Sequence, residues 1–259
     1  ALVAAGLTAM AAGGLANWAY GMQGFVLLHE RQPVRLGPAT LESFTCGPLA
    51  DLRELDLTLA LARLRFRAAG REGFKPRSEL RLLDAAGEEE GLAVEVGRAA
   101  AHRDLWLHQG AFGFSPHLVV AAGGKAVLDE YVPFRTVVDG KGGVAFAGEL
   151  TVAAARLALR GTITLDDLDD EMRGHPTLEL ELSEGGGPPR RVALKPGEMA
   201  DLEGRLRVGF TGLRRWAEID VSRRTYRAPV LAGGALLALG ALTWGLAAWR
   251  GRRAARPRV

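Results

Sequence analysis

Two long runs without a charged side chain stand near the two ends of this chain of 259 residues. Residues 1–28 form the first run and residues 228–249 form the second, while nearly all ionic groups lie between or beyond them. A helix of about 20 apolar residues is long enough to cross the hydrocarbon core of a bilayer. The sequence therefore predicts transmembrane helices at residues 1–22 and 228–249, with a separate domain at residues 30–227.

The first run is rich in alanine and glycine. Asn17, Trp18 and Tyr20 are typical of a membrane interface and predict that the helix ends near residue 20. A cleaved signal peptide is the alternative, but the basic segment that begins such a peptide is missing. The chain does not open with methionine, so we expect further residues upstream of Ala1. Small residues favour close helix packing in lipid, and we expect this of Gly13, Gly14, Gly233, Gly234 and Gly240.

The last ten residues, 250–259, form a basic tail that contains Arg250, Arg252, Arg253, Arg256 and Arg258. Under the positive-inside rule this tail is cytoplasmic, although Arg223, Arg224 and Arg227 at the other end of the second run reduce the asymmetry. The domain is then expected on the periplasmic side of a bacterial inner membrane. The chain has 33 basic and 30 acidic side chains, and without the tail the basic count falls to 28. No basic face for nucleic acid is indicated, and the expected partner of the tail is anionic lipid.

The middle of the chain has the alternation of a half-buried antiparallel sheet. In residues 55–66, every second residue is leucine up to Leu61, and the phase then shifts to Leu64 and Phe66, which predicts a bulge near Ala62 and Arg63. Residues 177–183 alternate leucine and glutamate just as strictly. Turn residues recur about every ten positions, which is typical of a sandwich or barrel. The predicted fold is therefore mainly β, an extracytoplasmic antiparallel β-sandwich or barrel-like domain between two transmembrane helices.

Few side chains in this domain have the spacing of a catalytic or metal site. Cys46 is the only cysteine, so no internal disulfide forms and no haem is bound covalently through a Cys-x-x-Cys-His element. We interpret Cys46 as a small residue beside a turn, with an exposed free thiol as the alternative. The acidic run 166–171 departs from the order of a calcium loop, and the glycines of residues 137–146 favour a hairpin over a phosphate loop. We predict no catalytic residue and no metal site, and we expect His102 and His175 to face solvent.

The stretch DLWLHQGAFGFSPHLVV, residues 104–120, holds two further histidines, His108 and His117. Its first residues alternate with period two, as a strand does. Gly110, Gly113 and Pro116 then predict a turn, after which a second strand begins. We therefore interpret the two histidines as incidental to a strand, a turn and a strand.

Several of these elements together resemble the ResB-like proteins of cytochrome c biogenesis. They are the segment GFVLLHERQPV after the first span, the segments FKPRSELRLLD and WLHQGAFGFSPHLVV, and a last span that is followed by arginines. In that family an extracytoplasmic β domain is held between membrane helices. Lys75, Pro76 and Ser78 match a Lys-Pro-x-Ser element of the family. A second element, Tyr-Gln-x-x-x-Gly-x-Ser-Pro, is matched by Gln109, Gly113, Ser115 and Pro116, while His108 occupies its aromatic position.

The resemblance implies a membrane-anchored, non-catalytic part of c-type cytochrome maturation. Its expected partners are the lipid bilayer, a polytopic membrane protein that handles haem, and apocytochrome c. No haem is bound covalently, and the resemblance implies that haem could reach this chain through that partner. The family typically has three helices before the domain, and its upstream haem-associated histidine has no counterpart in this sequence. An accessory or structural subunit of a membrane redox complex, with the same fold, is therefore the alternative.

His29 is the candidate for a contact with haem or with the partner. It follows the apolar segment GFVLL, so we expect it at the outer face of the membrane, where an imidazole can meet a flat apolar ligand. The alternative is an interfacial histidine that turns toward water beside Glu30. We expect His29→Ala to weaken haem retention without unfolding the domain.

Overall fold

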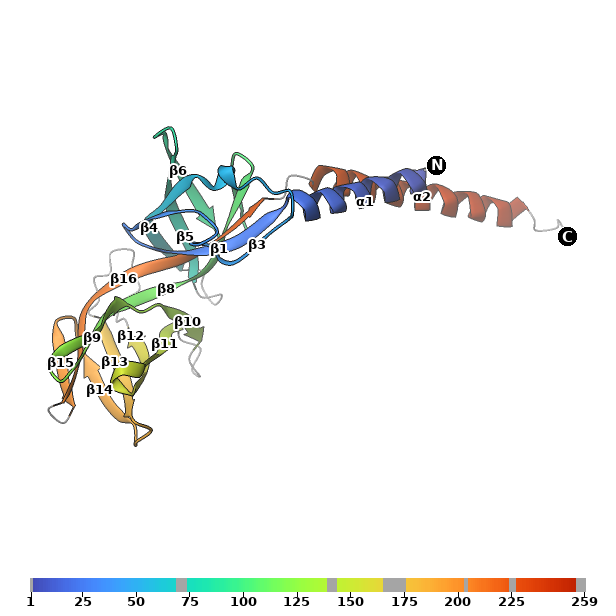
Figure 1. The fold of residues 1–259 in the computed structure, drawn as a ribbon. Coiled ribbons are helices and arrows are strands. Elements are labelled where there is room, and N and C mark those ends of the chain that lie inside the picture. Colours follow the sequence, from blue (N-terminus) through green and yellow to red (C-terminus); the bar gives the residue numbers. More distant parts are fainter. Residues whose placement is uncertain are drawn as a thin grey trace.

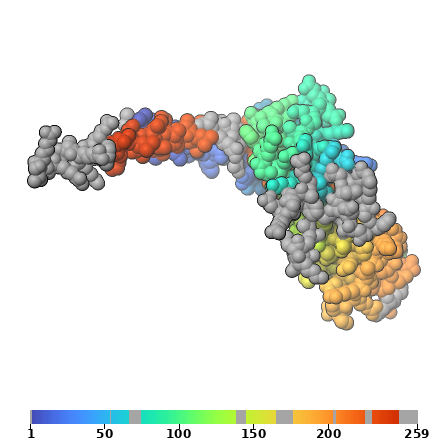
Figure 2. Space-filling model, turned by 180° about the vertical axis from the view of Figure 1, so that it is seen from behind, coloured from blue at the N-terminus to red at the C-terminus, as the bar shows by residue number. Residues whose placement is uncertain are grey.

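The predicted fold class, a mainly β antiparallel body between two apolar helices, is confirmed by a computed structural model of the chain, which describes residues 2–68, 74–138, 144–164, 176–202, 205–223 and 227–254. Antiparallel strands form a large body, and the helices α1 (Leu2–Tyr20) and α2 (Arg227–Ala254) project from one end of it (Figure 1). The space-filling view from behind shows the same outline, a narrow helical rod beside a broad body (Figure 2). Each helix is long and apolar enough to cross a membrane, and only 11% of the residues in each apolar segment are buried.

The two helices pack against each other in antiparallel directions through small residues. A side chain on Gly6 would come within 2.7 Å of the Gly233 carbonyl oxygen, and one on Gly13 would meet Val230. Gly240 lies against Val3 in the same way. Of the five glycines expected to pack closely with each other or with partner helices, Gly13, Gly233 and Gly240 lie between α1 and α2, whereas a side chain added at Gly14 or Gly234 would meet nothing within 4 Å. Glycine removes the side-chain bulk that would otherwise separate the two backbones.

In the part of the chain that the structure describes, the strands form a sheet of twelve and a sheet of four. The larger sheet runs in the order β14-β13-β12-β11-β10-β8-β16-β1-β3, with β7, β9 and β15 paired beside it, and the smaller runs β2-β4-β5-β6. In chain order, the strands are β1 (Met22–His29), β2 (Pro33–Arg35), β3 (Glu42–Cys46), β4 (Leu57–Ala68), β5 (Phe74–Asp84), β6 (Glu89–Glu95), β7 (Ala100–His102), β8 (Leu105–Ala122), β9 (Lys125–Tyr131), β10 (Phe134–Val138), β11 (Val144–Val152), β12 (Leu157–Thr164), β13 (Thr177–Glu184), β14 (Arg190–Leu194), β15 (Glu198–Leu202) and β16 (Leu206–Arg223).

The body has two lobes that share the long strands β8 and β16 (Figure 1). In the lobe next to the helices, the four-stranded sheet packs on β1 and on the adjacent parts of β8 and β16, as in a sandwich. In the distal lobe, β9 to β15 curl round so that β14 contacts β15, which gives a barrel-like shape. Both architectures expected from the sequence thus occur, one in each lobe.

The alternating segments fold as their pattern predicts. Leu57, Leu59 and Leu61 are buried on one face of β4, and the register shifts between Leu61 and Arg63, where the bulge was expected. Leucines at every second position of β13 are buried as well. Leu55 is also buried, but it lies in the 3-10 helix η1 (Leu52–Leu55), ahead of the strand. Burial of one apolar face of each strand therefore accounts for the register in which these strands pair.

The predicted turn within residues 104–120 is wrong. Residues 105–120 belong to one continuous strand, β8, which pairs with β16 along nearly its whole length. Gly113 allows the Phe134 carbonyl to approach, because a side chain there would overlap that oxygen atom. Pro116 accepts a hydrogen bond from the Val132 amide (3.0 Å) through its carbonyl. Because the amide and carbonyl of one strand residue point to the same side, the missing N–H of Pro116 faces away from β16.

The β body begins earlier than expected, and the second helix ends later than expected. Residues 23–29, which the sequence assigned to neither helix nor domain, form most of β1. Helix α2 continues to Ala254, five residues into the basic tail, and residues 255–259 lie outside the described part of the chain. The acidic run 166–171, His175 and the centre of the glycine hairpin at residues 139–143 also lie outside it.

Candidate functional site

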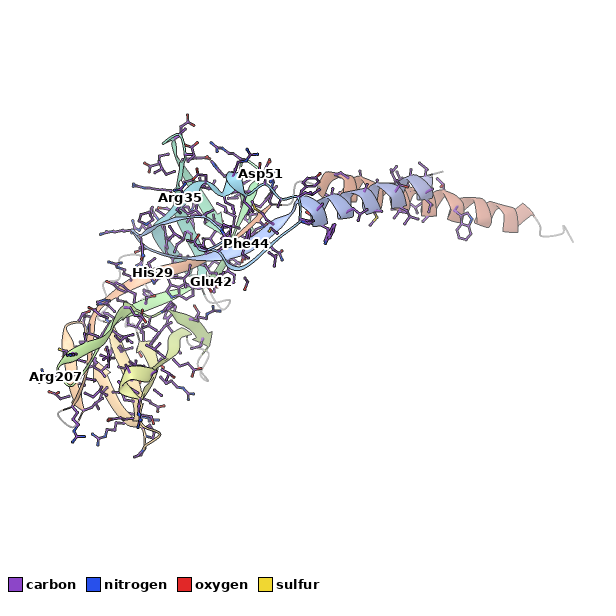
Figure 3. All side chains as sticks on the ribbon, viewed as in Figure 1. His29, Arg35, Glu42, Phe44, Asp51 and Arg207 are labelled. Atoms are coloured by element: carbon purple, nitrogen blue, oxygen red, sulfur yellow. The ribbon has the colours of Figure 1, made fainter. Side chains whose placement is uncertain are left out.

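His29 lies where the two lobes meet, and this differs from the expected position at the membrane face. Helix α1 ends at Tyr20, and the apolar segment before His29 is the extended strand β1. A strand rises about 3.3 Å per residue, so the seven steps from Met22 to His29 span about 23 Å. Figure 3 shows His29 well away from the helices, between the two lobes. The helix was expected to end near residue 20, as it does, but the strand that follows it was not predicted, because a buried strand and the end of a membrane segment are both apolar.

His29 is held by a hydrogen bond that crosses from β1 to β8. Its Nε2 atom lies 2.9 Å from the Ser115 hydroxyl, and Ser115 is fully buried. Burial lowers the pKa of His29 below its usual value, and the nearby Arg214 cation lowers it further. A neutral imidazole is thus favoured here. Ligation of iron through Nε2 would require loss of the bond to Ser115.

An aromatic and basic cluster lies beside His29, built around Tyr131 at the end of β9. The Arg214 guanidinium stands 4.1 Å from the centre of the Tyr131 ring, in cation–π geometry. The His117 ring centre is 4.5 Å from that of Tyr131, and the His29 ring centre is 6.0 Å away. His117 is fixed in turn by Thr211 at 2.5 Å and by Asp129 at 3.2 Å. One of the two histidines of β8 therefore lies near His29, although 88 residues separate them.

The titration of His29 gives a testable pH dependence. Because its pKa is lower in the folded chain than the usual value of 6.5, the unfolded chain binds a proton that the folded chain does not. Stability is therefore lost as the pH falls below about 6.5. When the pH is lowered from about 7.5 to about 5, the thermal midpoint of the full chain in detergent should fall. We expect this fall to be smaller for His29→Gln than for the natural chain. Equal falls of the thermal midpoint for the two chains would show that the protonation of His29 does not cause the loss of stability at low pH.

A buried arginine joins the two sheets next to this cluster. Arg215 of β16 is 4% exposed and donates to the Leu64 carbonyl of β4 at 2.7 Å. The Glu30 carboxylate accepts from the Leu64 amide, also at 2.7 Å, and lies 4.0 Å from Arg215. The Arg215 guanidinium also stands 5.4 Å from the centre of the Phe66 ring. Both backbone groups of Leu64 are thus bound by side chains, one from Arg215 of β16 and one from Glu30, which directly follows β1.

The two sequence elements of the ResB-like resemblance meet in space. Ser78 of the first element donates to the Gln109 side-chain oxygen of the second at 2.5 Å, and both residues are buried between the sheets. Ser115 of the second element contacts His29, and Gly113 makes room for the Phe134 carbonyl. That carbonyl also accepts from the Trp216 indole at 3.1 Å. Residues about 30 positions apart thus form one packed unit, and their observed roles are structural.

The remaining candidate side chains lie apart from His29. Within the described residues, no group of three or more His, Cys, Asp or Glu side chains could hold a metal ion. Cys46 is the last residue of β3 and lies beside a turn, as expected. Its thiol is free and exposed, as in the alternative interpretation. The prediction for His102 is wrong: its side chain is only 11% exposed and lies 2.6 Å from Glu90. Residue His108 of β8 pairs with Asp220 in the strand register.

Sequence reasoning missed Tyr131, Arg214 and Arg215. Tyr131 reads as an ordinary strand residue, and it joins the cluster only because β9 folds back on β8. The sequence signal for the two arginines is that Arg214 and Arg215 are adjacent within one strand. In a strand, neighbours point to opposite faces, so one of two adjacent arginines must face inward. Arg215 is that residue.

No family model matches this chain, and no curated protein matches it.

Proposed function

We propose that this protein is a membrane-anchored, non-catalytic component of c-type cytochrome maturation, of the ResB-like type. The observation that carries the proposal is the hydrogen bond between Ser78 and Gln109. It joins the Lys-Pro-x-Ser element to the second element of the resemblance, so that two matches made independently in the sequence belong to one structural unit. Gly113 and Ser115 of the second element have definite packing roles in the same unit.

The two helices support a periplasmic position for the β body. They pack antiparallel and leave the body at the same end, as spans that enter and leave a membrane on one side must (Figure 1). The strands and loops of the body cannot lie in hydrocarbon, where loop backbone groups would be unsatisfied. The five arginines after residue 249 favour a cytoplasmic C-terminus, which puts the body outside.

In this role the chain supplies a docking body, and haem is carried by a polytopic membrane partner. The partner contacts helices α1 and α2 within the membrane and presents haem on its outer face. Apocytochrome c would receive haem there, beside the lobe that is next to the helices. Large apolar side chains, among them Leu231, Leu242 and Trp244, are exposed on α2 and can meet lipid or partner helices.

An accessory subunit of a membrane redox complex is the second candidate. The environment of His29 favours it, because this histidine is bound to Ser115 and lies at the far end of β1 from the helices. A side chain placed there serves to join the lobes. In this case the chain would clamp redox subunits and would need no haem.

Haem content distinguishes the two candidates. We expect the full-length chain, solubilised and purified together with its membrane partner, to bring haem with it, measured by pyridine haemochrome absorbance. A redox assembly that is retained without haem would support the accessory role and exclude the maturation role.

The same preparation of the His29→Ala variant tests the candidate contact: lower haem content with an unchanged circular dichroism spectrum supports it. Unchanged haem content removes His29 from the haem site.

A further inference from the structure

A pocket lies where helix α1 joins the β body. Its volume is about 300 Å³. It is formed by the end of α1, the start of β1, the end of β3 and the end of β16, three strands that are neighbours in the larger sheet. The residues that line it are Asn17, Trp18, Gly21, Met22, Gln23, Thr45, Cys46, Gly47, Pro48 and Arg223.

Backbone hydrogen bonds fix this junction. The Gly21 amide donates to the Asn17 carbonyl at 2.8 Å, and the Gly47 amide donates to Gly21 at 2.8 Å. The Leu49 amide reaches the Ala19 carbonyl at the same distance. A side chain on Gly47 would overlap the Trp18 carbonyl oxygen, so the chain passes as close to the helix end as a backbone can. The pocket is therefore held in a fixed position next to the C-terminal end of α1.

If α1 crosses a membrane, the pocket lies at the depth of the lipid headgroups. Trp18, in the last turn of α1, is 68% exposed, and Leu49 in the adjoining turn is 58% exposed. Tryptophan side chains are enriched at the boundary between hydrocarbon and headgroups. An exposed leucine beside this tryptophan can lie in the same boundary layer. Trp18 is also one of the residues that line the pocket.

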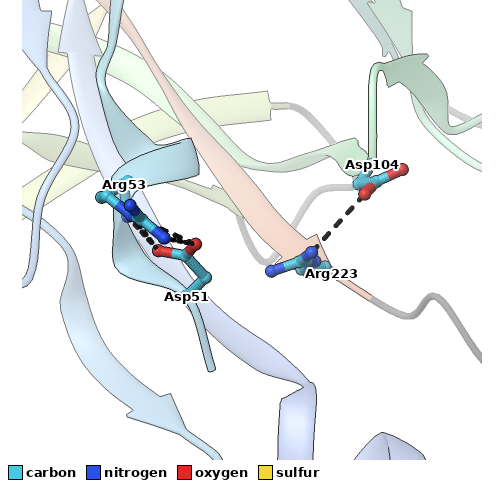
Figure 4. Close-up of polar contacts among 4 residues, drawn as sticks. All are labelled: Asp51, Arg53, Asp104 and Arg223. Carbon is cyan, nitrogen blue, oxygen red and sulfur yellow. Dashed lines mark hydrogen bonds and ion pairs between the residues drawn. The ribbon is translucent and has the colours of Figure 1, made fainter. Parts of the chain in front are cut away.

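Arg223 is the one cation among the residues that line this pocket. Its side chain is 13% exposed and lies 3.5 Å from Asp104, whose side chain is 53% exposed (Figure 4). A second pair, Asp51 with Arg53, stands nearby at 2.8 Å. Hydrogen bonds from Arg53 lower the pKa of Asp51 to about 2, and the charge of Arg223 adds a smaller effect in the same direction.

We propose that this junction pocket binds the phosphate group of a glycerophospholipid from the adjacent leaflet. The Arg223 guanidinium supplies the charge-assisted hydrogen bonds that recognise phosphate, and the Asn17, Gln23 and Thr45 side chains offer neutral polar groups around it. Trp18 and Leu49 contact the glycerol and the first acyl carbons. The inference rests on the part of the proposed function in which α1 crosses a membrane, and it is independent of cytochrome maturation.

Native mass spectrometry of the full-length chain tests this site. The chain is extracted from vesicles of phosphatidylethanolamine and phosphatidylglycerol, and the fraction that carries a phospholipid is followed as detergent is increased. We expect Arg223→Gln to retain phospholipid about tenfold more weakly, since a charge-assisted hydrogen bond is lost. Asp104→Asn, which removes the competing carboxylate, should retain at least as much as the natural chain. The matched control is Arg207→Gln, in the distal lobe, where Arg207 pairs with exposed Asp201 at 2.9 Å (Figure 3).

Two results would overturn the proposal. Equal retention by Arg223→Gln and the natural chain would mean that the pocket does not recognise phosphate. Equal loss in Arg223→Gln and Asp104→Asn would mean that the ion pair only holds the junction together. Either result leaves the proposed function untouched, because membrane insertion and haem content are measured separately.

Discussion

Gly113→Ala is expected to lower the thermal midpoint of the full-length chain by about 6–12 °C, or to prevent folding, because overpacking by one methyl group costs about 3 kcal/mol where neighbours cannot move. The neighbour here is the Phe134 carbonyl, which the new side chain would overlap. That carbonyl cannot easily move away. It is bound by the Trp216 indole, and the next residue, Arg135, pairs with Gly113 itself in the strand register.

Gly91→Ala is the matched control for this variant. Gly91 also lies within a strand, β6, but nothing stands within 4 Å of the position that a side chain would take. The change there is expected to shift stability by no more than about 0.5 kcal/mol. Thermal unfolding in detergent, followed by circular dichroism, measures both variants. A Gly113→Ala chain as stable as the Gly91→Ala chain would contradict the packing described at the meeting of β8 and β10.

Arg215→Met is expected to cost about 3 kcal/mol, since removal of one partner of a buried ion pair leaves the other uncompensated. The Leu64 carbonyl loses its donor, and the Glu30 carboxylate loses the cation 4.0 Å away. Glu30 is 23% exposed, so water compensates part of its charge and places the cost at the lower end of the range for such pairs.

The double variant Arg215→Met with Glu30→Gln separates the charge from the packing. Removing the uncompensated carboxylate should restore part of the stability, with a coupling energy above about 0.5 kcal/mol in a double-mutant cycle. Arg207→Met, which breaks an exposed pair with Asp201, should change stability by less than about 1 kcal/mol. Additive effects of the two changes at Arg215 and Glu30 would contradict a direct interaction between them.

The local pattern of apolar residues was sufficient to predict the strands that bury one face. The leucines of β4 and β13 stand at every second position, which predicted their burial, and the change of phase after Leu61 predicted the bulge between Leu61 and Arg63. The reason is physical: a slip by one residue would turn every leucine of a strand toward water. The end of α1 at Tyr20 was also predictable, because interfacial side chains mark it.

Local pattern failed where a distant residue decides the conformation. Gly113 and Pro116 read as turn residues, but the approach of Phe134 and the amide of Val132 give them their roles within a long strand. These contacts come from segments that follow later in the chain. A glycine needed for close approach and a glycine needed for a turn look alike in a sequence.

The candidate site was predictable only in part. His29 was identified from the sequence, but its position was not, because the apolar residues before it continue the pattern of the membrane run. Its neighbours Ser115, Tyr131 and Arg214 come from strands β8, β9 and β16. The register of those strands is set by pairing across the sheet, which one sequence does not contain.

The position of the β body relative to the membrane is the claim on which the proposed function rests, and protease protection in spheroplasts measures it directly. A tag is placed after Val259, protease is added to the outer face, and a cytoplasmic protein serves as the control for membrane integrity. We predict that the β body is degraded while the tag stays protected, because the arginines that precede it hold the C-terminus in the cytoplasm. An intact β body together with a digested tag would reverse the topology and contradict a role in haem delivery on the periplasmic side.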